Sequence, residues 1–364
     1  MKRHSMDVTL FVTVMLLLGI GLMMVFSSSY YFLISSDQHW SYYFMKDLRM
    51  IVLGLVAMFA TALFPYRLYK RFTPLILVVS IILCILVLTP VGTEINGSQR
   101  WIFIGSISIM PSEIAKIAVI LFSAHLVERM QDQMKSLTQG LLPFLVLAGV
   151  FFALINPQPD LSSAVTVVGI VIVMVFVGGA SIPQLAGIGV LGAIGLVAAV
   201  KAAPYRMERW LVFLDPFKYS QQGGWQIIQS LYALGSGGTF GVGIGQSVQN
   251  KLWLPEPQND FIFATIGEEF GFIGGAFVIL LFLLLIYRGV KIAANAPDLY
   301  GSMIATGITA MIGIQVMINI GVATGSMPVT GIPLPYISYG GNATIMLLAG
   351  TGILLNVSQY TKKG

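Results

Sequence analysis

The segment Leu254–Phe263 places a carboxylate between a proline-containing stretch and a long apolar run, in the sequence Leu-Pro-Glu-Pro-Gln-Asn-Asp-Phe-Ile-Phe. Asp260 falls where the N-cap of the following helix would be, and a capping carboxylate would complement the helix dipole. The alternative is a general base, held on a rigid element and free to accept a proton. Position alone leaves both interpretations open.

Glu113 and Lys116 form a second pair of candidate groups at the start of another apolar run. Their spacing places both side chains on one face of a helix. Charges this close to hydrocarbon must pair with each other or face a water-filled cavity. The pair is therefore either a structural ion pair or a cation that contacts an anionic substrate group.

Three arginines lie in the polar segments between apolar runs. Arg100 precedes Trp101 in the first substantial segment, and Arg206 and Arg209 begin the longest one. An exposed arginine is usually solvated or bound to a lipid phosphate. Guanidinium groups also bind phosphate oxygens in a bidentate manner, so three of them on one side of a membrane could form a pyrophosphate clamp.

Further acidic residues have more ordinary explanations. Asp160 lies in a very short connection between two apolar runs, where capping of the next helix is the favoured interpretation. Glu268 and Glu269 lie about two turns into an apolar run, where an unpaired charge is unfavourable. We expect at least one of them to face a polar interior or to be neutral.

Several common site types are absent from the sequence. The glycine-rich run Gly235–Gly245 lacks the Gly-Lys-Ser/Thr ending of a phosphate-binding loop, so its glycines more plausibly serve tight backbone turns. No His-Glu-x-x-His or Gly-x-Ser-x-Gly motif occurs, which removes zinc hydrolases and the commoner serine hydrolases. The single cysteine, Cys84, excludes a disulfide within one chain.

The elements that must position these groups are membrane-spanning helices. Of 364 residues, 56% are hydrophobic and 10% are charged, and mean hydropathy is +0.85, whereas soluble domains contain about 25% charged residues. The apolar runs match the roughly 20 residues that a helix needs to cross a bilayer. We predict an all-α, polytopic integral membrane protein that forms a single transmembrane domain over 1–364. Its ten predicted spans are 8–34, 48–64, 73–90, 112–128, 141–156, 161–179, 183–202, 261–287, 300–322 and 341–358.

Charge in the short loops predicts the orientation. With both termini in the cytoplasm, the inner segments carry most of the basic residues, as the positive-inside rule requires. These are Lys2, Arg3, Arg67, Lys70, Arg71, Arg129, Lys135, Arg288, Lys291, Lys362 and Lys363, against Lys46, Arg49 and Arg100 in the short outer loops. The long segment 203–260 then forms a large extracellular loop before the eighth span, and 91–111 and 323–340 lie on the same side.

Taken in order, the motifs resemble the SEDS family of bacterial envelope proteins (shape, elongation, division and sporulation), whose branches include RodA, FtsW and SpoVE. The short tails and the opening segment around Asp7 favour the FtsW/SpoVE branch. The matching motifs cover nearly the whole chain. They are Arg100-Trp101, Pro111–Lys116, Gln158–Leu161, Gln229–Ala233, Leu254–Glu256 with Asp260–Phe263 and Gly267–Glu269, and Thr330–Gly341.

This resemblance implies a peptidoglycan glycosyltransferase that polymerises lipid II into glycan strands at the outer face of the bacterial cytoplasmic membrane. Lipid II already carries a good leaving group, so the reaction needs one base and positive charge for the departing diphosphate. Asp260 is the proposed catalytic base. The substrate-binding candidates are Arg100, Glu113, Lys116, Asp160, Arg206, Arg209 and Ser338.

The resemblance also implies partners and leaves alternatives open. A divalent cation such as Mg²⁺ or Mn²⁺ would help to neutralise the diphosphate, although the sequence contains no dedicated cage of ligands. The expected protein partner is a class B penicillin-binding protein, a transpeptidase that crosslinks the new strands. A flippase that transports lipid II, or a scaffold for other envelope proteins, would suit a polytopic chain as well.

Overall fold

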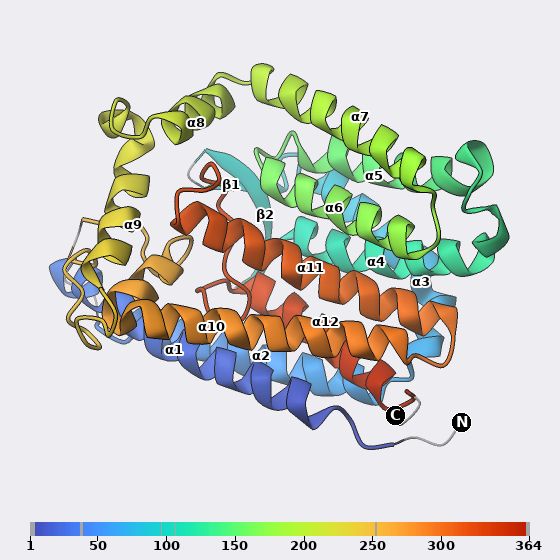
Figure 1. The fold of residues 1–364 in the computed structure, drawn as a ribbon, viewed down its shortest axis with the longest axis horizontal. Coiled ribbons are helices and arrows are strands. Elements are labelled where there is room, and N and C mark those ends of the chain that lie inside the picture. The colour runs from blue at the N-terminus through green and yellow to red at the C-terminus, as the bar shows by residue number, and fades with distance from the viewer. Residues whose placement is uncertain (1–3, 37–38, 96, 106, 252, 362–364) are drawn as a thin grey trace.

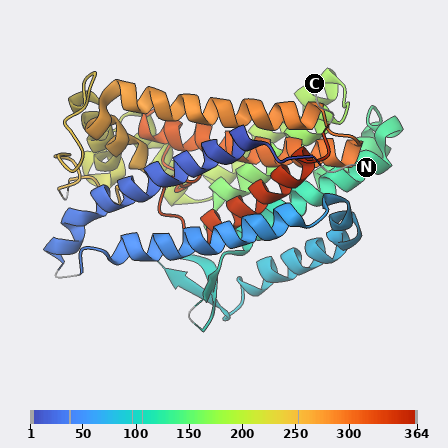
Figure 2. The ribbon, with the colours of Figure 1, turned by 90° about the horizontal axis from the view of Figure 1, so that it is seen from below.

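The computed structural model describes residues 4–36, 39–95, 97–105, 107–251 and 253–361. Within these residues, ten helices run roughly along one axis and form a bundle (Figures 1 and 2). They are α1 Val8–Ser35, α2 Tyr42–Leu63, α3 Tyr66–Leu86, α4 Pro111–Arg129, α5 Leu142–Ile155, α6 Leu161–Val177, α7 Ile182–Lys201, α10 Ile262–Ala294, α11 Leu299–Ala323 and α12 Asn342–Ser358.

Each of the ten predicted spans corresponds to one of these helices, and the all-α membrane fold is confirmed. Six helices of the described chain are long and apolar enough to cross a bilayer by length and composition, and α6 and α12 are shorter apolar helices. The largest boundary errors concern the starts of α2 and α3 and the end of α10. α2 and α3 begin earlier than predicted, and α10 ends later, because these ends carry charged residues, including Lys46, Arg67 and Arg288, which hydropathy alone assigns to loops.

The polar connections gather at one end of the bundle, which we call the loop end (Figure 1). The segment 203–260 contains α8 Pro204–Leu214, the single π-helical turn η3 Ser220–Gly224, and α9 Trp225–Ser236. Residues 92–109 form a small antiparallel sheet of three strands, β1 Gly92–Ile95, β2 Ser98–Ile104 and β3 Ile107–Ile109. Neither the sheet nor the two short helices was predicted from the sequence. Both described chain ends lie at the opposite end of the bundle.

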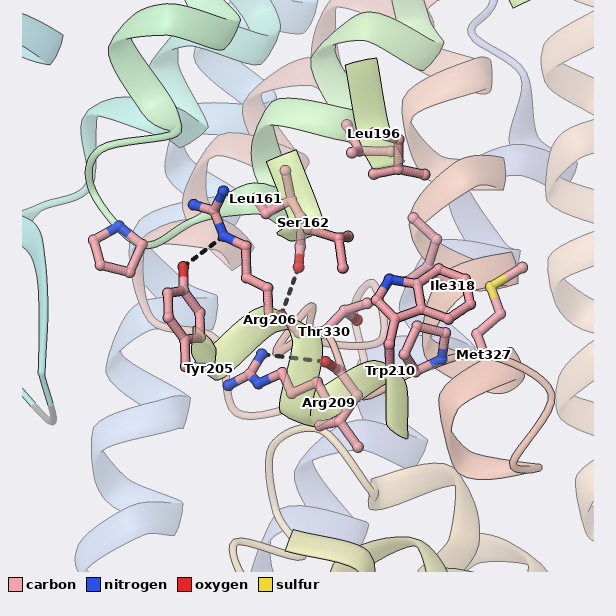
Figure 3. A pocket seen from close by; sticks show the side chains of 15 residues that line it. Leu161, Ser162, Leu196, Tyr205, Arg206, Arg209, Trp210, Ile318, Met327 and Thr330 are labelled. Carbon is pink, nitrogen blue, oxygen red and sulfur yellow. Dashed lines mark hydrogen bonds between the residues drawn. The ribbon is translucent and has the colours of Figure 1, made fainter. Parts of the chain in front are cut away.

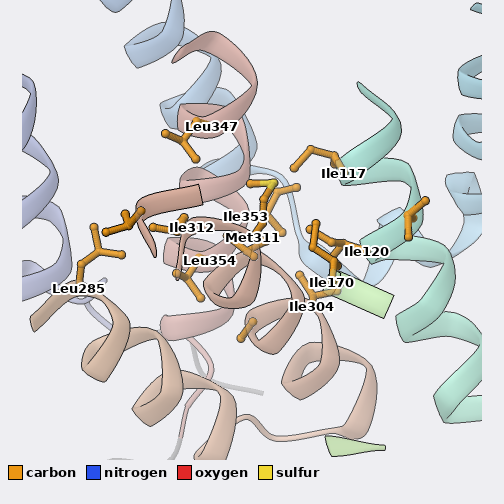
Figure 4. Packing of buried hydrophobic residues seen from close by; sticks show 14 of the residues in the cluster. Ile117, Ile120, Ile170, Leu285, Ile304, Met311, Ile312, Leu347, Ile353 and Leu354 are labelled. Carbon is orange, nitrogen blue, oxygen red and sulfur yellow. The ribbon is translucent and has the colours of Figure 1, made fainter. Parts of the chain in front are cut away.

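The core lies where α11 packs between α4, α6, α10 and α12 (Figure 4). Its side chains are almost all aliphatic, and Ile304, Ile312 and Leu354 are fully buried. These central helices are apolar around most of their circumference, as expected for helices with neighbours on all sides. They therefore form a rigid support for the loops at their ends.

Two close helix contacts depend on small or polar residues. α12 crosses α2 so closely that a Cβ on Gly352 would lie 2.1 Å from the carbonyl oxygen of Met58. Nearby, Tyr66 N donates to the Asn356 side-chain oxygen at 2.8 Å, and the Asn356 amide donates to Ala62 O at 2.7 Å. Asn356 thus satisfies backbone groups at the corner between α2 and α3, inside an apolar bundle.

α10 is interrupted at Gly271, which has φ +68° and ψ −166°. The glycine-rich run fills this interruption: Phe272 N donates to Gly238 O at 2.8 Å, and Gly243 N donates to Glu269 O at 3.0 Å. A Cβ on Gly241 would lie 2.2 Å from Glu269 O, so a larger residue has no room there. This close backbone packing agrees with the interpretation of the run as structural rather than nucleotide-binding.

The contact at Gly352 generates a stability prediction. Gly352→Val forces the α2–α12 interface apart, and overpacking of this kind destabilises a protein by about 1–3 kcal/mol. Thermal unfolding of the detergent-solubilised protein should therefore occur at a lower temperature. The matched control is Gly19→Val in α1, where nothing lies within 4 Å of the added Cβ. Equal melting temperatures for the two variants would contradict the close contact.

Candidate active site

Asp260 lies at the loop end, in the turn that leads into α10. The N-cap of α10 is Phe261, so Asp260 precedes the cap and the capping interpretation is wrong. The side chain is partly buried and faces a cavity of about 360 Å³. Among the described residues, none donates a hydrogen bond to its carboxylate. This group is therefore available to a bound molecule.

The backbone around Asp260 is held by hydrogen bonds from distant segments. The Asn319 amide of α11 donates to Asp260 O at 3.0 Å and to Ile332 O at 2.8 Å. The Ser338 hydroxyl donates to Asn259 O at 2.6 Å, and it accepts from Leu334 N at 2.8 Å. The loop 324–341 and α11 together fix the position from which the Asp260 side chain extends.

The cavity brings together five of the residues that the sequence singled out. Its lining includes Arg100, Glu113, Lys116, Asp160 and Asp260. They come from β2, from the start of α4, from the α5–α6 connection and from the turn before α10, so the tertiary fold alone unites them.

Gly331 keeps the cavity open beside Asp260. Its φ of +78° favours glycine, and a Cβ there would lie 3.8 Å from the Asp260 Oδ2 atom. Any larger side chain at this position would be strained and would occupy the space in front of the carboxylate.

Glu113 and Lys116 form an ion pair, with 2.7 Å between Lys116 Nζ and Glu113 Oε1. The side chains are only 8% and 3% exposed. A pair this deeply buried needs its partner charge, because a lone buried charge is strongly destabilising. The pair also lines the cavity, so a contact with substrate stays a prediction beside the observed structural role.

Arg100 donates hydrogen bonds to the connection between α5 and α6, and Asp160 is part of that connection. Arg100 Nε donates to Gln158 O at 3.2 Å, and its NH2 group donates to Pro159 O. Asp160 is the N-cap of α6 and accepts from Ser163 N at 3.2 Å, which confirms the capping interpretation. Its second oxygen accepts from the Ser112 hydroxyl at 3.3 Å. Both side chains are thus oriented by backbone contacts while they line the cavity.

Arg206 and Arg209 line a second cavity of about 340 Å³ between α6, α7, α8 and α11 (Figure 3). The buried Arg206 donates to Ala199 O at 3.0 Å and to Asn156 O at 3.1 Å. Arg209 donates to Val329 O at 3.1 Å. The structure therefore places Arg100 with Asp260 and places the other two arginines across a wall from them. Their contact with substrate stays a prediction.

The electrostatic environment of Asp260 suits a base. Removal from water and, second, the negative charge of Glu256 raise the pKa of the Asp260 carboxyl to a net value of about 6. The positive charges of Arg209 and Arg100 oppose this shift. A base with a pKa slightly below neutrality is mostly ionised at pH 7 and is still basic enough to accept a proton.

Two residues that shape the site were not identified from the sequence. Lys46 of α2 lines the cavity, and its Nζ lies 5.8 Å from the centroid of the Tyr339 ring. Asn319, near the end of the predicted span 300–322, positions the Asp260 backbone. A polar residue inside an apolar helix was the signal that could have identified Asn319. Lys46 had no comparable signal, because it was counted only as a loop charge.

The other acidic groups do not join the cavity. Glu268 accepts from Val248 N at 2.8 Å, and Glu269 accepts from the Ser27 hydroxyl, so they bind α10 to neighbouring segments. This agrees with the expectation that they face a polar interior.

Over the described part of the chain, His, Cys, Asp and Glu side chains form no group of three that could hold a metal ion.

The comparisons with known proteins agree over almost the full chain. The family model of FtsW, RodA and SpoVE, described as "Cell cycle protein", matches residues 8–363. The chain is 46% identical to stage V sporulation protein E of Bacillus subtilis, covering 99% of each chain. It is 36% identical to a probable peptidoglycan glycosyltransferase FtsW of Trichlorobacter lovleyi, covering 98% of this chain and 94% of that protein.

Solved structures show the same fold. The crystal structure of the rod shape determining protein RodA of Thermus thermophilus is 28% identical, covers 98% of both chains, and gives a TM-score of 0.73. A chain from a peptidoglycan synthase complex is 28% identical, with a TM-score of 0.79 and 97% coverage of both chains. The chain therefore belongs to the FtsW/RodA/SpoVE family, the SEDS proteins, and within it to the FtsW/SpoVE branch.

Proposed function

We propose that this membrane protein is a peptidoglycan glycosyltransferase that polymerises lipid II. The observation that carries the proposal is the Asp260 carboxylate, which lacks a hydrogen-bond partner among the described residues and lies in one cavity with Arg100 and Lys116. Relatives that are named peptidoglycan glycosyltransferases support it. A base beside cations is the arrangement that a transfer reaction with a diphosphate leaving group requires.

In the proposed reaction, Asp260 accepts the proton of the acceptor sugar hydroxyl. The hydroxyl oxygen forms a bond to the anomeric carbon of the lipid-linked donor. The bond from that carbon to the phosphate oxygen breaks, and the diphosphate leaves with the electron pair. A single carboxylate is enough, because the leaving group is stable as an anion and needs no general acid.

The cations would bind the departing diphosphate. Arg100 and Lys116 line the cavity of Asp260, and Glu113 orients Lys116. Arg206 and Arg209 would act from the neighbouring cavity, where they face the lipid-linked part of a substrate. Asp160 would hold the connection that carries Arg100, and Ser338 would act by holding the turn before Asp260.

The proposed setting is the bacterial cytoplasmic membrane, with both termini in the cytoplasm. The charge asymmetry of the short loops supports this orientation, which places the loop end and the segment 203–260 outside. On the outer side, the product strands would be accessible to a transpeptidase. A class B penicillin-binding protein is the proposed partner, and the related chain from a peptidoglycan synthase complex supports that assignment.

Replacing the base gives the first test. Asp260→Asn keeps the shape of the side chain and removes its basicity, so polymerisation of purified lipid II should fall by about 10²–10⁴-fold. Glu208→Gln, an exposed carboxylate on α8, is the matched control and should leave the rate unchanged. Strand length is measured by gel electrophoresis of labelled lipid II, with and without the transpeptidase. Normal polymer from Asp260→Asn, or transport of lipid II without polymer from the unmodified protein, would contradict the proposal.

The raised pKa of Asp260 predicts an acid limit of activity. The rate should fall as the pH drops through about 6, because the protonated carboxyl no longer accepts a proton. Glu256→Gln removes a negative charge that raises this pKa, so the limit should move to lower pH. Initial rates between pH 4.5 and 8 check both statements, and Glu208→Gln should leave the profile unchanged. A profile unaffected by Glu256→Gln would show that another group sets the limit.

A further inference from the structure

A third cavity, of about 570 Å³, lies at the loop end beside that of Asp260. We call it the amide–tyrosine cavity, after Asn250, Gln258, Tyr42, Tyr43 and Tyr339, which line it. It lies between the start of α2 and the segment 250–259, which immediately precedes Asp260. The reaction proposed above places no part of a substrate in this cavity.

Two buried amides in this cavity each have one atom without a partner in the described chain, although Asn250 Oδ1 accepts from the Thr265 hydroxyl at 3.0 Å. Asn250 and Gln258 are 3% and 5% exposed, and neither Asn250 Nδ2 nor Gln258 Oε1 has a hydrogen-bond partner among the described residues. Buried polar groups in native proteins are nearly always hydrogen-bonded, so an unpaired donor and an unpaired acceptor at one cavity indicate a polar ligand. With Asn259 Oδ1, which is also buried and unpartnered in the part of the chain that the structure describes, the cavity therefore offers one donor and two acceptors from neutral side chains.

The opposite wall is aromatic. Tyr43 lies between Tyr42 and Tyr339, at centroid distances of 5.3 and 5.2 Å and with nearly perpendicular rings. Lys46 Nζ lies 5.7 Å from the Tyr42 centroid, which holds its charge over the ring. Tyrosine combines an apolar face with a polar hydroxyl. A pyranose ring has the matching surface, with C–H groups on its face and hydroxyls on its edge.

A phosphate has fewer cationic partners in this cavity than in the cavity of Asp260. The charged residues of its lining are Lys46, which is shared with the Asp260 cavity, and Glu256, whose carboxylate accepts from the Asn259 amide at 2.6 Å. Arginine is absent from the lining among the described residues, whereas Arg100 and Lys116 line the cavity of Asp260. An anionic diphosphate therefore fits the Asp260 cavity, and a neutral saccharide fits the amide–tyrosine cavity.

We propose that the amide–tyrosine cavity binds the acceptor saccharide, an inference that rests on the proposed glycosyl transfer. Lys46, Asn259 and Tyr339 line both cavities and form the wall between them. Asp260 follows Asn259 directly at this wall. The diphosphate of the donor then lies in the cavity of Asp260, and the acceptor sugar lies in the amide–tyrosine cavity. Asp260 lies at the boundary between them, where it can accept the proton of the acceptor hydroxyl.

The test uses a neutral, peptide-free tetrasaccharide of β-1,4-linked N-acetylglucosamine. It is titrated against the full-length protein in lipid nanodiscs, and binding is followed by saturation-transfer-difference NMR. Gln258→Met keeps the side-chain length and removes the amide, so the tetrasaccharide should bind about threefold to tenfold more weakly, the loss of one hydrogen bond. Gln249→Met is the matched control. Gln249 also has a buried, unpartnered Oε1, but it does not line the cavity, and its replacement should leave binding unchanged.

Two further experiments with the same tetrasaccharide test whether the site binds the acceptor. The tetrasaccharide should slow polymerisation of lipid II as it saturates the protein, and it should bind Asp260→Asn as tightly as the unmodified protein. Absence of saturable binding, equal losses in both glutamine variants, or binding of the free stem pentapeptide instead would overturn the saccharide site. Binding without inhibition would overturn its acceptor role. Saturable binding to a protein that never forms polymer would leave the saccharide site standing and refute the proposed polymerase function.

Discussion

The hydrogen bonds from Asn319 to the carbonyl oxygens of Asp260 and Ile332 are the constraint on which the site depends. The Asp260 carboxylate has no partner among the described residues, so the backbone alone determines where it points. One amide in the apolar helix α11 fixes both that backbone and the loop opposite it. Breaking these hydrogen bonds would leave the buried Asn319 Nδ2 without a partner, which is unfavourable, so these contacts should persist when substrate binds.

Placement of charge gives the site its chemistry. Burial and Glu256 raise the pKa of Asp260, while Arg209 and Arg100 lower it, and the balance at about 6 makes a base that is ionised near neutrality. The arginines and Lys116 line the cavity of Asp260 or its neighbour, whereas Asn250, Gln258, Tyr42 and Tyr43 line a third cavity beyond Asn259. Lys46 and Tyr339 line both the Asp260 cavity and the third cavity. A reaction that transfers a glycosyl group from a diphosphate to the hydroxyl of a neutral sugar ring needs such a division.

The membrane helices were predictable from sequence because each is a continuous apolar block with enough length to span a bilayer. The strands β1, β2 and β3 and the helices α8 and α9 were not predicted, because they lie in polar segments whose apolar residues show no clear helical or strand periodicity. Asp260 was identified partly by family resemblance, and its supposed N-cap position was wrong by one residue. Asn319 and Lys46 act through contacts with distant segments, which leave no local pattern to detect.

Chemical rescue tests the role of Asp260 most directly. Asp260→Ala leaves space beside Gly331, and an external carboxylate such as formate could enter it and serve as the base. The account predicts that formate restores lipid II polymerisation in proportion to its concentration, that the more basic acetate restores more per molecule bound, and that chloride restores none. A folded Asp260→Ala protein that polymerises lipid II at the unmodified rate without formate would contradict the account.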